Sequence, residues 1–197
     1  TVLGNGRYMG LGLMVPVRQV DGIYAFTITD GLAHDADTLD LARALRRAVM
    51  TRVQDHIGKH EKLPAFFTGH EDDGEPARSG NHEHLAFVPD LARQRLLVIA
   101  PHVIEHRECS KNERDHLGTL ACALNGLSEL RAGRAGKLGL ERAGIDPDTD
   151  PLFVTSKVWT SATPYTPTRH AKRNGRDSLH DDVLKEVQRR RLPAPQA

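Results

Sequence analysis

Hydrophobic spacing predicts a strand followed by a long helix in the first third of the chain. Residues 22–29 alternate in polarity from one side chain to the next, which is typical of a β-strand. After a capping residue, Asp37 or Thr38, apolar side chains recur at every fourth position and indicate a helix that Gly58 can end. The predicted apolar stripe consists of Leu41, Leu45, Val49 and Val53. Arginines occupy the other faces, the usual pattern of a solvated surface, at positions Arg43, Arg46, Arg47 and Arg52.

A long polar connection, residues 60–81, precedes two further predicted strands. Glycine and proline interrupt this connection repeatedly, and a loop of such length is often functional. The pattern then predicts strands over His82–Val88 and Arg95–Ala100, joined around Pro89 and Asp90. The second of these strands is a plain apolar run, as expected of a buried strand.

A second helix is predicted to begin at a capping box, Ser110–Glu113. Gly133 can end this helix, and Lys137–Glu141 predict a short strand after it. The order from residue 22 to residue 141 is therefore β-α-β-β-α-β, which predicts an α+β fold of the ferredoxin-like (RRM-like) type, followed by an extended basic C-terminal segment. Many domains of unrelated function share this arrangement, so the fold alone defines no function. The apolar stripe of the second helix consists of Leu117, Leu120, Ala121, Leu124 and Leu127.

Length and composition favour one domain or slightly more. We expect residues 1–20 to be a glycine-rich segment that closes a preceding domain, and residues 21–197 to form the main domain. Because the chain begins at Thr1 inside a glycine-rich loop, we expect a fragment of a longer protein. Lysine and arginine number 27 against 26 aspartates and glutamates, so the global charge gives no sign of nucleic-acid binding.

The cellular compartment is indicated by the cysteines and by the hydropathy. Cys109 and Cys122 fit reduced thiols of a cytosolic protein better than a disulfide or a metal site. No apolar run is long enough to span a membrane, and no charged-then-apolar leader stands at the start. We therefore expect a cytoplasmic protein without membrane contact.

His82 and His84 are the most informative pair of residues in the chain. They stand one residue apart at the start of a predicted strand, where side chains at alternate positions share a face about 7 Å apart. Imidazole is the side chain that gives and takes protons near neutral pH. The pair therefore suits acid–base chemistry or metal binding.

Three chemistries and one structural explanation remain open for this pair. The first is metal-free RNA cleavage: one imidazole removes the 2′-hydroxyl proton, another group protonates the departing 5′-oxygen, and a nearby cation stabilises the phosphate. The second, a metal site, ranks lower because no second close ligand pair stands out. The third, a two-histidine phosphoesterase, lacks its second His-x-Ser/Thr strand. The structural explanation is a pair of surface histidines. The metal site would need to be completed by His70, Asp72, Asp73, His102 or His106.

Two further segments suit phosphate binding. Between Arg169 and Arg191 there are eight lysines and arginines against four acids, which is compatible with a phosphate-binding patch or with a solvated tail. The glycine-rich run near the start lets backbone N–H groups approach a phosphate, but a turn between strands is the favoured explanation for it on its own. The basic part without acids contains Arg169, Lys172, Arg173 and Arg176. The glycine-rich run contains Gly4, Gly6, Arg7, Gly10 and Gly12.

Four segments in order resemble one family. They are Gly4–Gly12, Phe67–Pro89, Val158–His170 and Arg189–Pro193, and they resemble the fused backbone-and-processing protein of type I-U (also called I-G) CRISPR systems. That family belongs to the repeat-associated RNA-binding (RAMP) superfamily, built from ferredoxin-like domains. The Trp-x-Ser-x-Thr-Pro-Tyr run and the loop–His-x-His–strand unit are the most specific motifs. Because the family's proteins are longer, the chain resembles their C-terminal, processing half.

The resemblance implies an enzyme that needs no metal or other cofactor. It would be an endoribonuclease that cleaves precursor CRISPR RNA within its repeats, leaves a 2′,3′-cyclic phosphate, and stays bound to the product. It would join the other subunits of a type I surveillance complex in antiviral defence. The alternative is a non-catalytic subunit that binds the guide RNA.

The resemblance also implies roles for single residues. His82 and His84 are the first choices for general base and acid, in either order, with His70 in reserve. Tyr165 would stack on a base, whereas Trp159 suits core packing. The phosphates would be held by Arg169, Lys172, Arg173 and Arg176, and the RNA backbone would approach Gly4, Gly6, Arg7, Gly10 and Gly12.

The chain departs from the family pattern at one place. The family often has an Asp-His pair at the start of the second hairpin strand, where this chain has Arg93-Gln94-Arg95-Leu96. If the family's histidine at that position takes part in catalysis, this chain has lost or replaced it.

Overall fold

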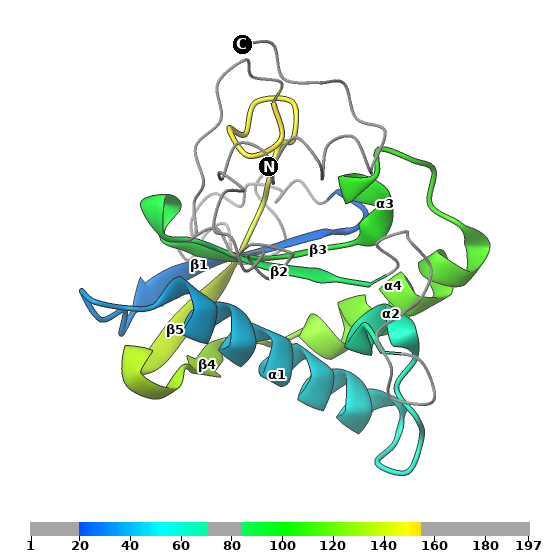
Figure 1. Ribbon diagram of the computed structural model, residues 1–197, viewed down its shortest axis with the longest axis horizontal. Helices are drawn as coiled ribbons and strands as arrows, with labels where there is room; N and C mark the ends of the chain where they lie inside the picture. The colour runs from blue at the N-terminus through cyan, green and yellow to red at the C-terminus, as the bar shows by residue number, and fades with distance from the viewer. Residues whose placement is uncertain (1–19, 71–83, 155–197) are drawn as a thin grey trace, which may run out of the picture. The chain divides into compact units, whose positions relative to one another are not determined.

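The fold combines helices with a curled antiparallel sheet, as the α+β prediction required. The computed structural model describes residues 20–70 and 84–154 (Figure 1). The sheet has the strand order β2-β3-β1-β5-β4, and every pairing in it is antiparallel. Its strands are β1 (Ile23–Asp30), β2 (Ala86–Asp90), β3 (Arg95–Ile99), β4 (Glu129–Arg131) and β5 (Lys137–Ala143).

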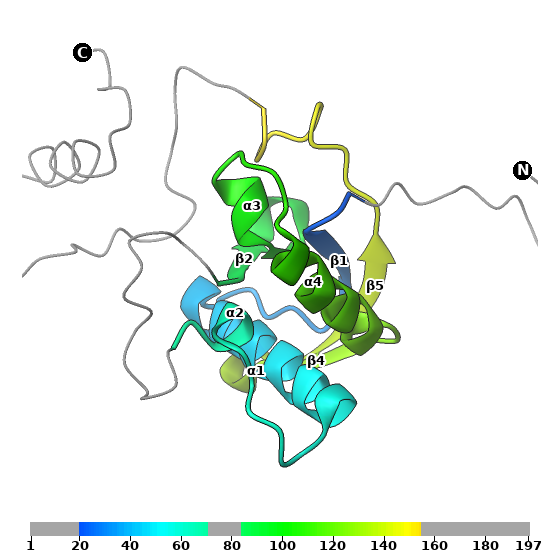
Figure 2. The ribbon, with the colours of Figure 1, turned by 90° about the vertical axis from the view of Figure 1, so that its right-hand side faces the viewer.

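Two long helices cover one face of the sheet. α1 (Thr38–Ile57) and α4 (Lys111–Leu124) contact each other and lie side by side beneath the strands (Figures 1 and 2). The shorter helical segments are α2 (Ala65–Thr68), α3 (Pro101–Ile104) and two 3-10 turns, η2 (Leu91–Arg93) and η3 (Gly133–Ala135). None of the helices that the structure describes is both long and apolar enough to cross a membrane.

The ends of α1 confirm the helix predicted from the sequence. The Asp37 side chain accepts a hydrogen bond from the backbone N–H of Leu39 at 2.6 Å, which caps the first turn. Gly58, at φ 116°, donates its N–H to the Gln54 carbonyl and ends the helix. The buried face carries the predicted apolar stripe together with Ala44.

The start of α4 is also confirmed, but its predicted end is wrong. The Ser110 hydroxyl accepts a hydrogen bond from the Glu113 N–H at 3.2 Å. The helix stops at Leu124, because Gly126 takes a left-handed conformation (φ 76°) before the chain reaches Gly133. Leu127 is buried from the loop beyond the helix rather than from its stripe.

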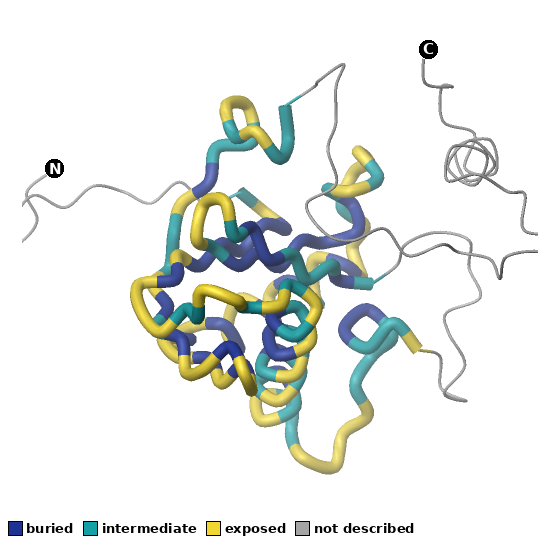
Figure 3. Tube along the Cα trace, turned by 60° about the vertical axis from the view of Figure 1, so that its left-hand side comes forward, coloured by how far each residue is buried: buried dark blue, intermediate teal, exposed yellow. Residues whose placement is uncertain are grey.

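Two hydrophobic clusters lie on the two faces of the sheet. The larger cluster packs Tyr24, Phe26 and Ile28 of β1 against α1 and α4. The smaller one lies on the opposite face, where Ile23 and Ala25 meet the chain that follows β5. Figure 3 shows the buried residues concentrated in the strands and on the inner sides of the helices.

An arginine at the start of β3 ties the segment after β5 to the sheet. The Arg95 guanidinium donates to Asp90 at 2.8 Å and, through Nη2, to Asp150 at 2.8 Å. The hydrogen bond from Arg95 lowers the pKa of Asp150. Arg95 thus links two carboxylates, one before β3 and one after β5.

Candidate functional site

The predicted hairpin strand begins later than the sequence suggested. β2 starts at Ala86, so His84 precedes the strand instead of lying on it. The reason is the partner strand: Ala86 pairs with Ile99, and Pro101 begins α3 two residues later, which leaves no strand opposite His84. The predicted joint at Pro89 and Asp90 is also inside β2, and η2 makes the turn.

His84 and His70 nevertheless line the same cavity, which we call the histidine pocket. It has a volume of about 430 Å³ and lies between the first half of α1, the end of α2 and the chain entering β2. Arg43 and Arg46 of α1 line it as well. Two of the three predicted catalytic histidines are thus brought together beside two guanidinium groups. The remaining wall is formed mainly by Leu39, Phe67, Thr68, Gly69 and Phe87.

The short helix α2 positions both histidines. Phe66 accepts a hydrogen bond on its carbonyl from the Leu85 N–H at 3.0 Å, which holds the chain next to His84 against α2. On the other side, the Thr68 hydroxyl accepts from the His70 N–H at 3.2 Å and lies 3.1 Å from the His70 carbonyl. The buried aromatic pair Phe66 and Phe67 anchors α2 in the core.

Gly69 lets the His84 imidazole approach the backbone. Gly69 has φ 71°, and a Cβ atom built on it would lie 3.2 Å from Cδ2 and 3.3 Å from Cγ of His84. Any other residue at this position would meet both an unfavourable conformation and the imidazole ring.

The His84 ring has a defined tautomer. Its Nδ1 lies 3.1 Å from the Leu85 carbonyl oxygen, which can only accept. Nδ1 therefore carries the proton of the neutral ring, and Nε2 is the nitrogen that can take up another proton. His84 is half-buried and His70 is exposed, so the pocket is open to solvent at His70.

The arginines of the pocket differ in how firmly they are held. The half-buried Arg46 donates through Nη2 to the Thr68 carbonyl, which ties α1 to α2. Arg43 is exposed, and its guanidinium lies 3.5 Å from the Asp40 carboxylate. The sequence pattern assigned both arginines to a solvated helix face, and only the packing of α2 against α1 reveals their place beside the histidines.

The other predicted site residues lie outside the described part of the chain. They are His82 and the RNA-binding candidates Gly4, Gly6, Arg7, Gly10, Gly12, Tyr165, Arg169, Lys172, Arg173 and Arg176. Trp159 and the metal-ligand candidates Asp72 and Asp73 also lie outside it.

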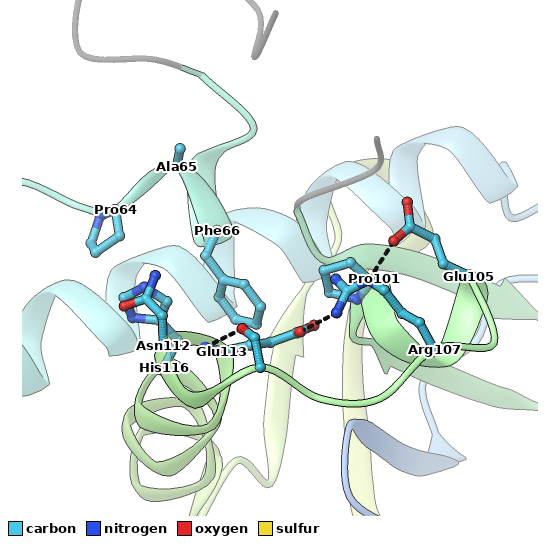
Figure 4. A pocket seen from close by; sticks show the side chains of 10 residues that line it. Pro64, Ala65, Phe66, Pro101, Glu105, Arg107, Asn112, Glu113 and His116 are labelled. Carbon is cyan, nitrogen blue, oxygen red and sulfur yellow. Dashed lines mark hydrogen bonds and ion pairs between the residues drawn. The ribbon is translucent and has the colours of Figure 1, made fainter. Parts of the chain in front are cut away.

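A second cluster of ionisable groups surrounds Glu113, at the start of α4. One Glu113 oxygen accepts from the His102 backbone N–H at 3.1 Å and lies 3.0 Å from His102 Nδ1. The other accepts from Arg107 at 2.7 Å, and Arg107 also pairs with Glu105 at 2.6 Å (Figure 4). Burial raises the pKa of Glu113, but the hydrogen bonds from Arg107 and His102 outweigh it and lower the pKa overall.

This cluster adjoins a cavity of about 530 Å³. Phe66 and the His116 ring stack in its wall, with centroids 5.1 Å apart and planes 28° from parallel (Figure 4). Burial lowers the pKa of His116, so its imidazole stays neutral at physiological pH. The sequence predicted only the capping role of Glu113, and its role in joining α3 to α4 was missed.

The same cluster brings together three groups that can bind a metal ion. Ligand atoms of His102, Cys109 and Glu113 all lie within 4.8 Å of one another. However, both Glu113 oxygens already accept hydrogen bonds, and Arg107 places a positive charge at the carboxylate. Burial and the nearby Glu113 charge raise the pKa of the Cys109 thiol, which disfavours the thiolate that a metal requires. The arrangement therefore fits a structural network better than a metal site.

Of the metal-ligand candidates that the structure describes, His70 shares the histidine pocket with His84. His102 is buried against Glu113, whereas His84 lines the histidine pocket. His102 and His106 are absent from the lining of that pocket.

Comparisons with known proteins add no relative. No family model, curated protein or solved structure matches the chain. The resemblance to the CRISPR processing family accordingly rests on the sequence motifs quoted above.

Proposed function

We propose that the chain is a metal-independent endoribonuclease and that the histidine pocket contains its reaction centre. The observation that supports this most directly is the convergence of His70, His84, Arg43 and Arg46 on one cavity. Two imidazoles supply a base and an acid, and two guanidinium groups supply positive charge for a phosphate.

The proposed reaction is an intramolecular transfer at phosphorus. One imidazole takes the proton of the 2′-hydroxyl, and the 2′-oxygen forms a bond to the adjacent phosphorus. The bond from phosphorus to the 5′-oxygen breaks, and the second, protonated imidazole donates its proton to that oxygen. The products are a 2′,3′-cyclic phosphate and a free 5′-hydroxyl, and the two histidines have exchanged protonation states.

Each residue of the pocket has a role in this reaction. Nε2 of His84 is the proposed proton-accepting nitrogen, because Nδ1 faces the Leu85 carbonyl. Arg46, held in place by Thr68, and the exposed side chain of Arg43 would stabilise the negative charge that grows on the phosphate oxygens. His82 remains a candidate for the acid or the base.

We further propose that the fold is ferredoxin-like and that the substrate is the repeat of precursor CRISPR RNA. The order β2-β3-β1-β5, with antiparallel pairs throughout and one long helix in each crossover, is the order that a β-α-β-β-α-β unit gives, and β4 adds a short strand outside it. The sequence motifs supply the link to CRISPR RNA. The protein would act in the cytoplasm as a subunit of a type I surveillance complex.

Cleavage of labelled repeat RNA in EDTA tests this proposal. The wild-type chain should cleave, and His84→Ala and His70→Ala should each lower the rate by about 10²-fold or more, because acid–base groups contribute on that scale. His34→Ala, at an exposed histidine outside the pocket, is the matched control and should cleave normally.

Three outcomes would contradict the proposal. Cleavage that EDTA abolishes would indicate a metal site instead. Undiminished cleavage by both histidine variants would remove the pocket from the reaction. Tight binding without any cleavage would favour the alternative of a guide-RNA-binding subunit.

A further inference from the structure

A second hollow lies on the other flank of α1, and we call it the arginine groove. It has a volume of about 760 Å³ and runs between α1, the end of α4 and β4. Arg47 and Arg52 of α1 and Arg131 of β4 line it. Two elements that are far apart in the sequence, α1 and β4, thus contribute arginines to one depression.

Positive charge in the groove is not neutralised by its surroundings. Arg47 and Arg131 are exposed, and neither guanidinium group forms a hydrogen bond or an ion pair with a residue that the structure describes. Of the two acids in the lining, Glu129 is paired with Lys137 at 2.6 Å. Asp55 is the remaining acid, so the lining carries more unpaired positive than negative charge.

Arg52 has a partly structural role in the same groove. Its Nη2 lies 3.4 Å from the Gly126 carbonyl oxygen, which fixes the guanidinium at the end of α4. A guanidinium held by one hydrogen bond keeps its remaining N–H donors for a ligand.

The groove and the histidine pocket are joined across the exposed ridge of α1. Arg43 lines the pocket and Arg47 lines the groove, and the two stand four positions apart on one helix. Residues at this spacing are neighbours, with Cβ atoms about 5–6 Å apart. Asp40 lies 3.5 Å from Arg43 at the pocket end of this ridge, and Arg47 carries the positive charge on toward the groove.

We infer that the arginine groove binds the phosphodiester backbone of the RNA that reacts in the histidine pocket. The inference rests on the proposed function for the identity of the polymer. A nucleic-acid backbone fits better than an acidic protein, because the guanidiniums are spaced along a continuous path and a repeating phosphate chain meets each in turn. Contacts of this kind position RNA without reading its sequence.

The test compares two double variants of the full chain. Arg47→Gln/Arg131→Gln removes the two unpaired guanidiniums, while Lys111→Gln/Arg114→Gln removes two exposed positive charges at the far end of α4. The probe is a 2′-O-methyl oligoribonucleotide of the repeat, which lacks the attacking hydroxyl and cannot be cleaved. Its affinity is measured by fluorescence anisotropy from about 50 to about 200 mM salt.

The groove variant should bind the probe roughly tenfold more weakly than the wild type at low salt. Its plot of log affinity against log salt concentration should have a slope shallower by about 1.4, because two phosphate contacts on a single strand are lost. The control variant should keep the wild-type slope. Equal slopes for the groove variant and the wild type would overturn the inference, and so would an equal loss in both double variants.

Failure of this inference is distinct from failure of the proposed function. If unmodified RNA is cleaved but the groove variant keeps the wild-type slope, the groove does not bind RNA, and the proposed reaction in the histidine pocket is unaffected. If the slope becomes shallower as expected but RNA is never cleaved, the groove binds RNA and the histidine pocket does not carry out the proposed cleavage.

Discussion

At the scale of single residues, the histidine pocket depends on the missing side chain of Gly69. Gly69→Ala places a methyl group against the His84 ring in a left-handed conformation. We expect a loss of about 1–2 kcal/mol in the free energy of unfolding, measured by urea titration. Cleavage should fall as well, because the ring must move away from its present position.

Gly118 offers the matched control for this substitution. It lies in α4 in ordinary helical conformation, and no atom stands within 4 Å of a Cβ built on it. Gly118→Ala should therefore raise the free energy of unfolding by up to roughly 1 kcal/mol and leave cleavage unchanged. A gain in stability for Gly69→Ala as well would show that neither φ nor the ring contact constrains that position.

The histidines could be predicted from residue type and spacing, but their surroundings could not. His70 and His84 stood out because imidazoles beside a polar loop suit proton transfer. Arg43 and Arg46 fit a solvated face equally well by helical periodicity. Their place in the pocket depends on α2, whose four residues are too few to give a periodic pattern.

At the scale of elements, local sequence signals predicted where helices start better than where helices end or where strands start and end. Asp37 and Ser110 cap their helices through hydrogen bonds within a few residues, and such signals are contained in the sequence. The start of β2 is set instead by its partner β3, which stops before Pro101. β4, of three residues, was missed because its pairing with β5 determines it.

The cap of α4 gives a prediction at this scale. Ser110→Ala removes the acceptor of the Glu113 N–H and should lower the free energy of unfolding by about 1 kcal/mol. Ser128→Ala, at an exposed serine outside any helix, is the control and should change stability by less than about 0.5 kcal/mol. Thermal and urea unfolding measure both. Equal losses in the two variants would contradict the capping role.

At the scale of the whole molecule, the Arg95–Asp150 pair makes the free energy of unfolding depend on pH. The pKa of Asp150 is lowered in the folded state, so the unfolded chain binds its proton first as the pH falls. The stabilisation is complete well above the ordinary carboxyl value of 3.8 and is lost as the pH falls through and below it. Asp150→Asn should therefore be less stable than wild type at neutral pH, and the difference should shrink at acid pH.

Urea titrations at several pH values between neutral and acid measure this difference. Asp148→Asn, at an exposed aspartate of the same segment, is the control. If the difference between Asp150→Asn and wild type stayed constant with pH, the pKa of Asp150 would not be lowered in the folded state.

The two outer strands of the sheet have a consequence for assembly. β4 has three residues, with charged side chains on either side of Leu130, and β2 contains Pro89, which has no N–H to offer. Short, charged or proline-bearing edges resist the addition of a further strand from another chain. Neighbouring subunits in an assembly would then recognise side chains on the helices and loops more readily than either margin of the sheet that the structure describes.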